Sequence, residues 1–253
     1  SPNALALFLG RVLPVAFVLL WATLTAAGLA DRRRWLAVAM ATAAIAAMAG
    51  AFYFTYSRGA FLGLGAGVLF ALLFLNRRAG LAATGLGAAA VIAILLAVPS
   101  ERLLSATPVL QRTYVWEAAL RMALDHPISG IGMDNFLYHY PRYILAQAAL
   151  EPNISHPHNL VLDYWLSLGA IGVGVGVGLQ LVFWRWFIAA IAAKVLYVRI
   201  AAVALAAGMV DFLVHGLIDN SYFLIDLAFL FWLGFGLMAV LSRGQTAVSE
   251  EKP

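Results

Sequence analysis

The sequence predicts an all-α, polytopic membrane protein with about seven transmembrane helices and a helical subdomain on the outer side of the membrane. Of its 253 residues, 64% are hydrophobic and 11% are charged, and the mean hydropathy is +0.91. Soluble domains carry about a quarter charged residues. The apolar residues are gathered into long runs, and half of the arginines stand in short segments between the runs. This pattern is typical of helices that cross a bilayer.

Seven apolar runs are long enough, or nearly long enough, to span a bilayer as helices. They are Ala4–Leu29, Leu36–Tyr56, Ala60–Leu75, Gly80–Val98, Leu160–Phe187, Ile200–Ile218 and Tyr222–Leu241. The expected organisation is four transmembrane helices in 1–98, a periplasmic helical subdomain in 99–158, three transmembrane helices in 159–241 and a cytoplasmic tail in 242–253.

Basic residues set the predicted orientation. They stand at the end of or after the first, third, fifth and seventh runs, at Arg32 to Arg34, at Arg77 and Arg78, at Arg185, Lys194 and Arg199, and at Arg243. By the positive-inside rule these segments are cytoplasmic, so residues 57–59, 99–158 and 216–221 face outward. The net charge of +4 and the pI of about 9.6 follow from this bias, and no nucleic-acid partner is expected.

Two further features of the sequence limit the chemistry and the organisation that can be proposed for the chain. The chain has no cysteine, which excludes a disulfide framework and thiolate chemistry. It opens with Ser1-Pro2-Asn3 and has neither an initiator methionine nor the basic start of a signal peptide. We therefore expect an N-terminally truncated chain, with further transmembrane helices upstream.

The long outer segment predicts two helices. The first is opened by Pro108 and runs through Asp125. Its apolar residues recur at spacings of three and four, as on a buried helix face: Val115, Ala118, Ala119 and Met122. A glycine-containing turn follows, and Asp134 or Asn135 is expected to cap a second helix that runs toward Leu150.

Two arginines on the outer side are candidates for binding an anion. Arg58 lies where the positive-inside rule gives no reason for an arginine, and a guanidinium at the membrane centre costs roughly 2.5–3.5 kcal/mol. Arg112 has no acidic residue three or four positions away, whereas Arg121 has Glu117 and Asp125. We expect Arg58 and Arg112 to clamp one diphosphate. The alternatives are an interfacial Arg58 that reaches lipid headgroups and a solvated Arg112.

His156 and His158 stand just before the fifth run. A His-x-His pair can bind a metal, with a third ligand from His126, His139 or a carboxylate. A general base is the favoured interpretation, because imidazole titrates near about pH 6.5 and accepts a hydroxyl proton at neutral pH. A histidine that only begins the helix is the third alternative.

Asp211, His215 and Asp219 recur every four residues along the sixth run, so we expect them to share one helix face. A carboxylate near mid-membrane is costly, so this face should look into the bundle or a wet cavity. The stripe is either a structural network or the floor of an active site, and Asp219 alternatively caps the turn into the seventh run.

Three groups of residues form a specific combination. The first is Ser57-Arg58-Gly59-Ala60-Phe61-Leu62. The second is Arg112 with Trp116-Glu117-Ala118-Ala119, followed by His126-Pro127-Ile128-Ser129-Gly130-Ile131-Gly132 and Asn135-Phe136. The third is His158-Asn159, followed after nine residues by Gly169-Ala170-Ile171-Gly172. Together they resemble the O-antigen ligase and polymerase superfamily of bacterial envelopes, over about residues 50–225.

The resemblance implies a glycosyltransferase of the bacterial inner membrane with its active site facing the periplasm. Its donor would be a glycan on undecaprenyl diphosphate and its acceptor the lipid A core, with no cofactor, metal or ATP. Carried over, Arg58 and Arg112 bind the diphosphate and His158 is the base in an inverting attack. Supporting residues are expected at His156, Asn159, Asp163, His215 and Asp219. Members of this family usually have about a dozen spans.

Other functions fit parts of the sequence. A polymerase of O-antigen or exopolysaccharide and a protein O-oligosaccharyltransferase share the donor chemistry and differ in the acceptor. In a transporter or lipid-binding membrane protein, Asp211, His215 and Asp219 would relay protons and Arg58 would hold an anion. That class predicts a repeat between halves, which the sequence does not show.

Overall fold

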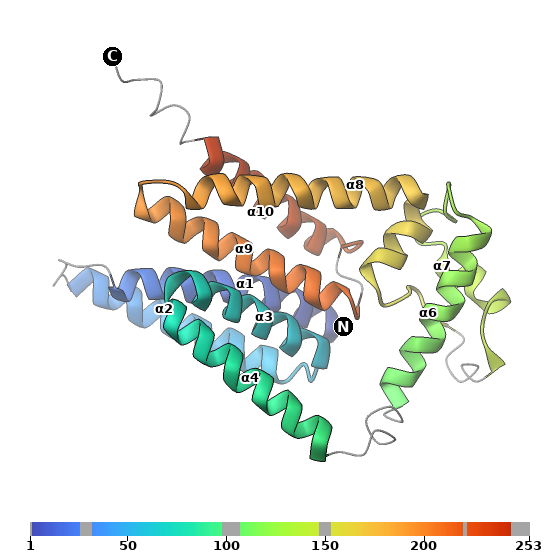
Figure 1. The fold of residues 1–253 in the computed structure, drawn as a ribbon, viewed down its shortest axis with the longest axis horizontal. Coiled ribbons are helices and arrows are strands. Elements are labelled where there is room, and N and C mark those ends of the chain that lie inside the picture. Colours follow the sequence, from blue (N-terminus) through green and yellow to red (C-terminus); the bar gives the residue numbers. More distant parts are fainter. Residues whose placement is uncertain (1, 26–31, 98–106, 147–152, 220–221, 244–253) are drawn as a thin grey trace. The chain divides into compact units, whose positions relative to one another are not determined.

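The computed structural model describes residues 2–25, 32–97, 107–146, 153–219 and 222–243, and in these residues every regular element is a helix (Figure 1). The helices are α1 (Pro2–Thr25), α2 (Arg32–Tyr53), α3 (Arg58–Leu75), α4 (Arg77–Ala97), α6 (Thr107–Asp125), α7 (Phe136–His139), the 3₁₀ helix η1 (Tyr140–Arg142), α8 (Leu160–Ile191), α9 (Leu196–Gly216) and α10 (Ile225–Arg243). The all-α fold class is confirmed.

Six of these helices are long and apolar enough to cross a membrane: α1, α2, α3, α8, α9 and α10. They coincide with the first three and the last three of the seven predicted spans. The remaining predicted span forms α4. The apolar runs of the sequence therefore mark the long helices of the structure, as expected for a polytopic membrane protein.

The chain divides into two compact units. The first unit comprises Ser1–Leu81, Val182–His215 and Tyr222–Pro253, and the second comprises Ala82–Leu181 and Gly216–Ser221. The chain passes from one unit to the other within α4, within α8, at the end of α9 and again before α10. Each unit is described below by itself.

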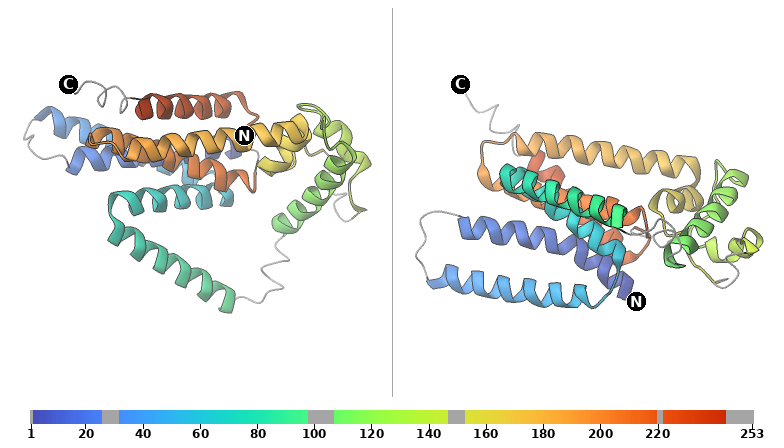
Figure 2. Two further views of the ribbon diagram at one scale, coloured as in Figure 1. Left: turned by 45° about the horizontal axis from the view of Figure 1, so that its top comes forward. Right: turned by 60° about the horizontal axis from the view of Figure 1, so that its bottom comes forward.

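In the first unit, α1 packs against α2, α3 and α10. Figures 1 and 2 show α1 and α2 lying side by side along their length. The contact is made by a buried apolar cluster from three helices: Ala6, Leu9, Leu13, Ile45, Phe52 and Ala60. Small residues such as Ala6 and Ala60 let the helix backbones approach closely, as is usual in membrane bundles.

Charged groups are buried in the middle of this apolar unit. Asp211 on α9 is fully buried, and a Cβ added to Gly10 or Gly63 would lie only 2.7 or 2.5 Å from its Oδ1 atom. Arg11 on α1 donates from Nη1 to the carbonyl of Leu227 at 2.8 Å. The carboxylate is thus enclosed where α1, α3 and α9 meet, with a guanidinium from α1 in the same unit.

In the second unit, α6 carries the core. Its predicted apolar stripe of Val115, Ala118, Ala119 and Met122 is fully buried, which confirms both the helix and the face. The stripe packs against the stacked rings of Phe136 and Tyr140, whose centroids are 5.2 Å apart, and against Leu166 of α8. A small helical core therefore joins the outer segment to the start of α8.

The predicted second helix toward Leu150 is wrong as to its length. Helix α7 is a single turn that ends at His139 and gives way to η1, while residues 147–150 lie outside the described residues. Pro141 has no backbone N–H to donate to the preceding helical turn, which ends the α-helix. Asn135 precedes α7, but its side chain donates to the carbonyl of Ile131 at 2.9 Å instead of capping the helix.

Helix α8 is interrupted at Gly169, which has φ 70° and ψ −169°. In a regular helix the N–H of Ala170 would donate to the carbonyl of Leu166. Instead the N–H of Ala170 donates to Pro127 at 3.0 Å, and the carbonyl of Leu166 accepts from Ile131 at 2.7 Å. The loop after α6 thus takes over both hydrogen-bonding groups that the break sets free.

We expect Gly169→Ala to destabilise the protein by about 3 kcal/mol or more, because only glycine adopts this backbone conformation readily. A Cβ there would also lie 1.7 Å from the carbonyl oxygen of Ile128. Thermal unfolding in detergent measures the effect.

The matched control is Gly174→Ala in the same helix. A Cβ at Gly174 meets no atom of the described residues within 4 Å, and alanine favours the helix by about 1 kcal/mol. An equal loss of stability in both variants would contradict the role assigned to the break.

Candidate active site

The site is organised at the start of α8. Asn159 caps this helix, since its Oδ1 atom accepts the backbone N–H groups of Val161 and Leu162 at 3.0 and 3.1 Å. Its Nδ2 atom donates to the carbonyl of Leu217 at 3.0 Å. One side chain therefore fixes both the helix start, where the histidines stand, and the turn that carries Asp219.

The central contact joins His158 to Asp219. The Nδ1 atom of His158 lies 3.0 Å from Oδ1 of Asp219, whose side chain is 2% exposed. An ionised carboxylate only accepts hydrogen bonds, so Nδ1 carries the hydrogen and the lone pair of the neutral ring lies on Nε2. His158 also has a left-handed backbone conformation, with φ 51°, which is uncommon for a residue other than glycine.

His156 shares the same carboxylate oxygen but is fixed differently. Its Nε2 atom lies 3.5 Å from Oδ1 of Asp219, and its Nδ1 atom lies 2.9 Å from the hydroxyl of Ser155. Both ring nitrogens of His156 thus have a polar neighbour. In the part of the chain that the structure describes, no hydrogen bond occupies Nε2 of His158.

Arg112 reaches the same aspartate from α6. Its Nη2 atom is 3.9 Å from Oδ2 of Asp219, and its side chain is 31% exposed. The sequence showed no acidic partner for Arg112 because the partner is more than a hundred residues away. Arg121 pairs with Glu117, as expected.

The other predicted partner of Arg121, Asp125, instead accepts the phenol hydrogen of Tyr143 at 2.8 Å. This hydrogen bond raises the pKa of Tyr143 above its usual value. The phenol therefore stays protonated at neutral pH, and the contact holds the end of α6 to the loop that follows α7.

Sequence reasoning missed the role of Trp116. Its indole Nε1 donates to the backbone carbonyl of His158 at 3.2 Å, and it lies one turn after Arg112 on the same face of α6. The signal in the sequence was the i, i+4 spacing of Arg112 and Trp116, which places them on a helix face beside the apolar stripe. A tryptophan that is half-buried commonly uses its N–H in this way.

The expected stripe of Asp211, His215 and Asp219 is not one helix face. Helix α9 ends at Gly216, so Asp219 lies in the turn beyond it and belongs to the second unit. Glycine commonly ends a helix, and this glycine stops the four-residue repeat. Asp211 and His215 are fully buried in the first unit.

The other predicted residues have these positions. Arg58 is exposed at the first residue of α3 in the first unit, and its pairing with Arg112 stays a prediction. Asp163 is 6% exposed in the first turn of α8, and within the described ranges its Oδ2 atom has no hydrogen-bond partner.

His126 and His139 lie edge to face with ring centroids 6.0 Å apart. Of the predicted third metal ligands, His126, His139 or a carboxylate, the group that lies next to His156 and His158 is the carboxylate of Asp219.

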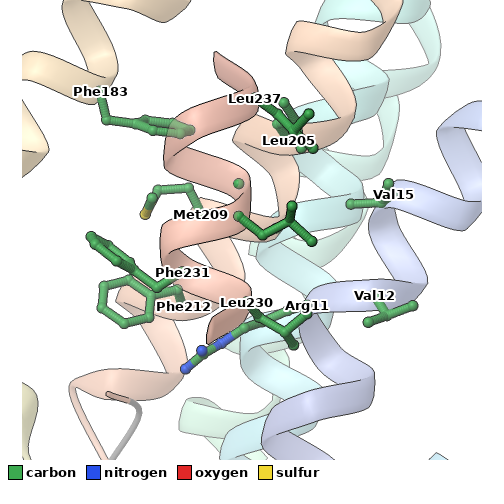
Figure 3. Close-up of a pocket in the computed structure, with 13 residues that line it drawn as sticks. Arg11, Val12, Val15, Phe183, Leu205, Met209, Phe212, Leu230, Phe231 and Leu237 are labelled. Carbon is green, nitrogen blue, oxygen red and sulfur yellow. The ribbon is translucent and has the colours of Figure 1, made fainter. Parts of the chain in front are cut away.

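An apolar pocket of about 240 Å³ lies in the first unit (Figure 3). It is lined by α1, the second half of α8, α9 and α10, with residues such as Val15, Phe183, Met209 and Phe231. Arg11 lies at one end and is the only charged residue in its lining. Around Asp219, two histidines and an arginine with partly exposed side chains converge on one buried carboxylate, so we take this cluster as the candidate active site.

Comparison with known proteins identifies the family of the chain. No curated protein matches the chain. A model of the family described as O-antigen ligase matches residues 43–175, which include Arg58, Arg112 and His158. This match covers more than half of the 253 residues, and the chain therefore belongs to the O-antigen ligase family of membrane glycosyltransferases.

Proposed function

We propose that the protein transfers a glycan from undecaprenyl diphosphate to a hydroxyl of the lipid A core, at the periplasmic face of the bacterial inner membrane. Membership of the O-antigen ligase family supports the reaction class. The observation that carries the proposal is the arrangement of His158, which has one nitrogen on Asp219 and the other unoccupied among the described residues.

In this proposal His158 is the general base. Asp219 holds the hydrogen on Nδ1, so Nε2 is the nitrogen that accepts the proton of the acceptor hydroxyl. As that proton leaves, the acceptor oxygen bonds to the anomeric carbon of the donor sugar. The bond from that carbon to the diphosphate oxygen breaks, and the electron pair leaves with the lipid diphosphate. Attack from the opposite side inverts the anomeric configuration.

Arg112 is proposed to bind the leaving diphosphate, together with Arg58. A guanidinium fork matches two phosphate oxygens and stabilises the charge that develops on them. The 3.9 Å separation between Arg112 and Asp219 is a loose ion pair, and the side chain is partly exposed, so the guanidinium can also contact a substrate. The lipid diphosphate is already a good leaving group from the anomeric carbon, so the reaction needs neither ATP nor a resident metal.

We expect His158→Asn to lower kcat by about 10²–10⁴-fold, the usual contribution of a general base. Asparagine tolerates the left-handed conformation and can still donate to Asp219, so the fold should be kept. The measurement is glycan transfer from an undecaprenyl diphosphate donor to a lipid A core acceptor, in EDTA and without ATP, with thermal unfolding as the check on folding.

His139→Asn, outside the site, is the matched control and should retain transfer. Loss of wild-type transfer in EDTA with rescue by a divalent ion would contradict the metal-independent mechanism. Transfer only to a second lipid-linked glycan or to a protein would show a polymerase or a protein O-oligosaccharyltransferase. No release of undecaprenyl diphosphate with any glycan acceptor would remove the enzyme assignment.

Arg112→Gln should lower kcat/KM for the lipid-linked donor by about 10–100-fold, since a charge-assisted hydrogen bond contributes about 1.5–3 kcal/mol. Arg121→Gln makes the same substitution on the same helix, at an exposed residue paired with Glu117. Steady-state kinetics with varied donor compare the two. Equal losses of kcat/KM in the two variants would show that the reaction depends on the net positive charge of α6 and not on a specific contact between Arg112 and the donor.

Trp116→Phe should lower kcat about three- to tenfold at nearly unchanged KM for the donor, because one hydrogen bond of about 1 kcal/mol that positions His158 is lost. Trp165→Phe removes an equivalent bond, from indole Nε1 to the carbonyl of Pro127 at 3.0 Å, away from His158. If both variants lower kcat equally, Trp116 has only a structural role.

A further inference from the structure

Three atoms that bind metals converge at the candidate active site. They are Nε2 of His156, Nδ1 of His158 and a carboxylate oxygen of Asp219, and all lie within 4.8 Å of one another. Both histidine nitrogens point at the same oxygen, Oδ1, from 3.5 and 3.0 Å. The two rings lie close together, with centroids 4.3 Å apart.

This donor set suits zinc. Two imidazoles and one carboxylate leave a fourth tetrahedral position for water, as in zinc sites with an open position. With zinc–ligand bonds near 2.0–2.1 Å, neighbouring ligand atoms are about 3.3 Å apart, close to the two distances to Oδ1. The histidine side chains are 29% and 25% exposed, so an ion can enter. Arg112 faces the other oxygen of this carboxylate, Oδ2, at 3.9 Å.

We propose that His156, His158 and Asp219 form a Zn²⁺ site and that Zn²⁺ bound there inhibits the enzyme. A metal on Nδ1 of His158 displaces the hydrogen from that nitrogen. The neutral ring then carries its hydrogen on Nε2, and Nε2 has no lone pair left for the acceptor proton. The metal thus imposes the wrong tautomer on the base. This inhibition rests on the proposed function, whereas zinc binding does not.

Binding is tested with the purified full chain in detergent, by competition between Zn²⁺ and a chromogenic chelator. The chain has no cysteine and five histidines, which limits the competing sites. We expect one Zn²⁺ per chain, and an affinity at least about tenfold weaker in His156→Asn. The double variant His126→Asn with His139→Asn removes the other facing histidine pair and should bind as the wild type does.

Two measurements keep the binding test decisive. Thermal unfolding shows whether His156→Asn folds, and Co²⁺ in place of Zn²⁺ gives an absorption spectrum whose intensity reports tetrahedral coordination. Equal Zn²⁺ affinity in wild type and folded His156→Asn would overturn the site. Loss of binding in the His126 and His139 double variant would also overturn it, since the metal would then lie elsewhere.

Inhibition is tested in the transfer assay. Zn²⁺ should abolish wild-type transfer at the concentration at which it binds, and EDTA should restore it. The double variant of His126 and His139 should be inhibited equally. Zn²⁺ that binds at the three residues without slowing transfer would overturn the inhibition and the role of His158 as base, and leave the metal site standing. Absence of wild-type transfer would overturn the proposed function, with the metal site decided by binding alone.

Discussion

The arrangement of the candidate site depends on one buried carboxylate. Asp219 is 2% exposed, and a carboxylate withdrawn from water is costly unless hydrogen bonds and positive charge compensate it. Its neighbours are His158 and His156 on Oδ1 and Arg112 on Oδ2. The need to compensate this one charge thus gathers a candidate base and a candidate anion-binding arginine from distant parts of the chain.

The helices supply the rigidity that this contact needs. Helix α6 buries one face in the core of the second unit and presents Arg112 and Trp116 on another. Helix α8 is tied to the loop after α6 through the break at Gly169, and its start is capped by Asn159. The two histidines are therefore held from both sides, by a helix start and by an indole on a packed helix. A catalytic group held by packed elements keeps its geometry better than one on a free loop.

The fold could be predicted from the sequence because apolar length is a local property. Runs such as Leu36–Tyr56 and the stripe on α6 need no information about distant residues. The resemblance likewise indicated Arg112 and His158, whereas their shared partner was misplaced. Asp219 fits a four-residue repeat with His215, and the repeat and the glycine at 216 were local signals that pointed to different helix ends. Arg11 was overlooked for the same reason, since its partner carbonyl belongs to Leu227 on a helix at the other end of the chain.

Two aspartates that are close in sequence illustrate why charge type alone does not identify a site. Asp211 is enclosed by helix backbones, with Gly10 and Gly63 leaving only enough room for its carboxylate. Its surroundings in the described residues are packed helices of the first unit, including Arg11 of α1. Asp219 is similarly buried, but its partners are side chains that are partly exposed. A proton or a substrate that binds to the exposed atoms of these side chains therefore alters their interaction with a buried carboxylate. The arrangement at Asp219 joins a buried carboxylate to side chains that remain accessible, as expected of a group that orients a proton acceptor toward a substrate.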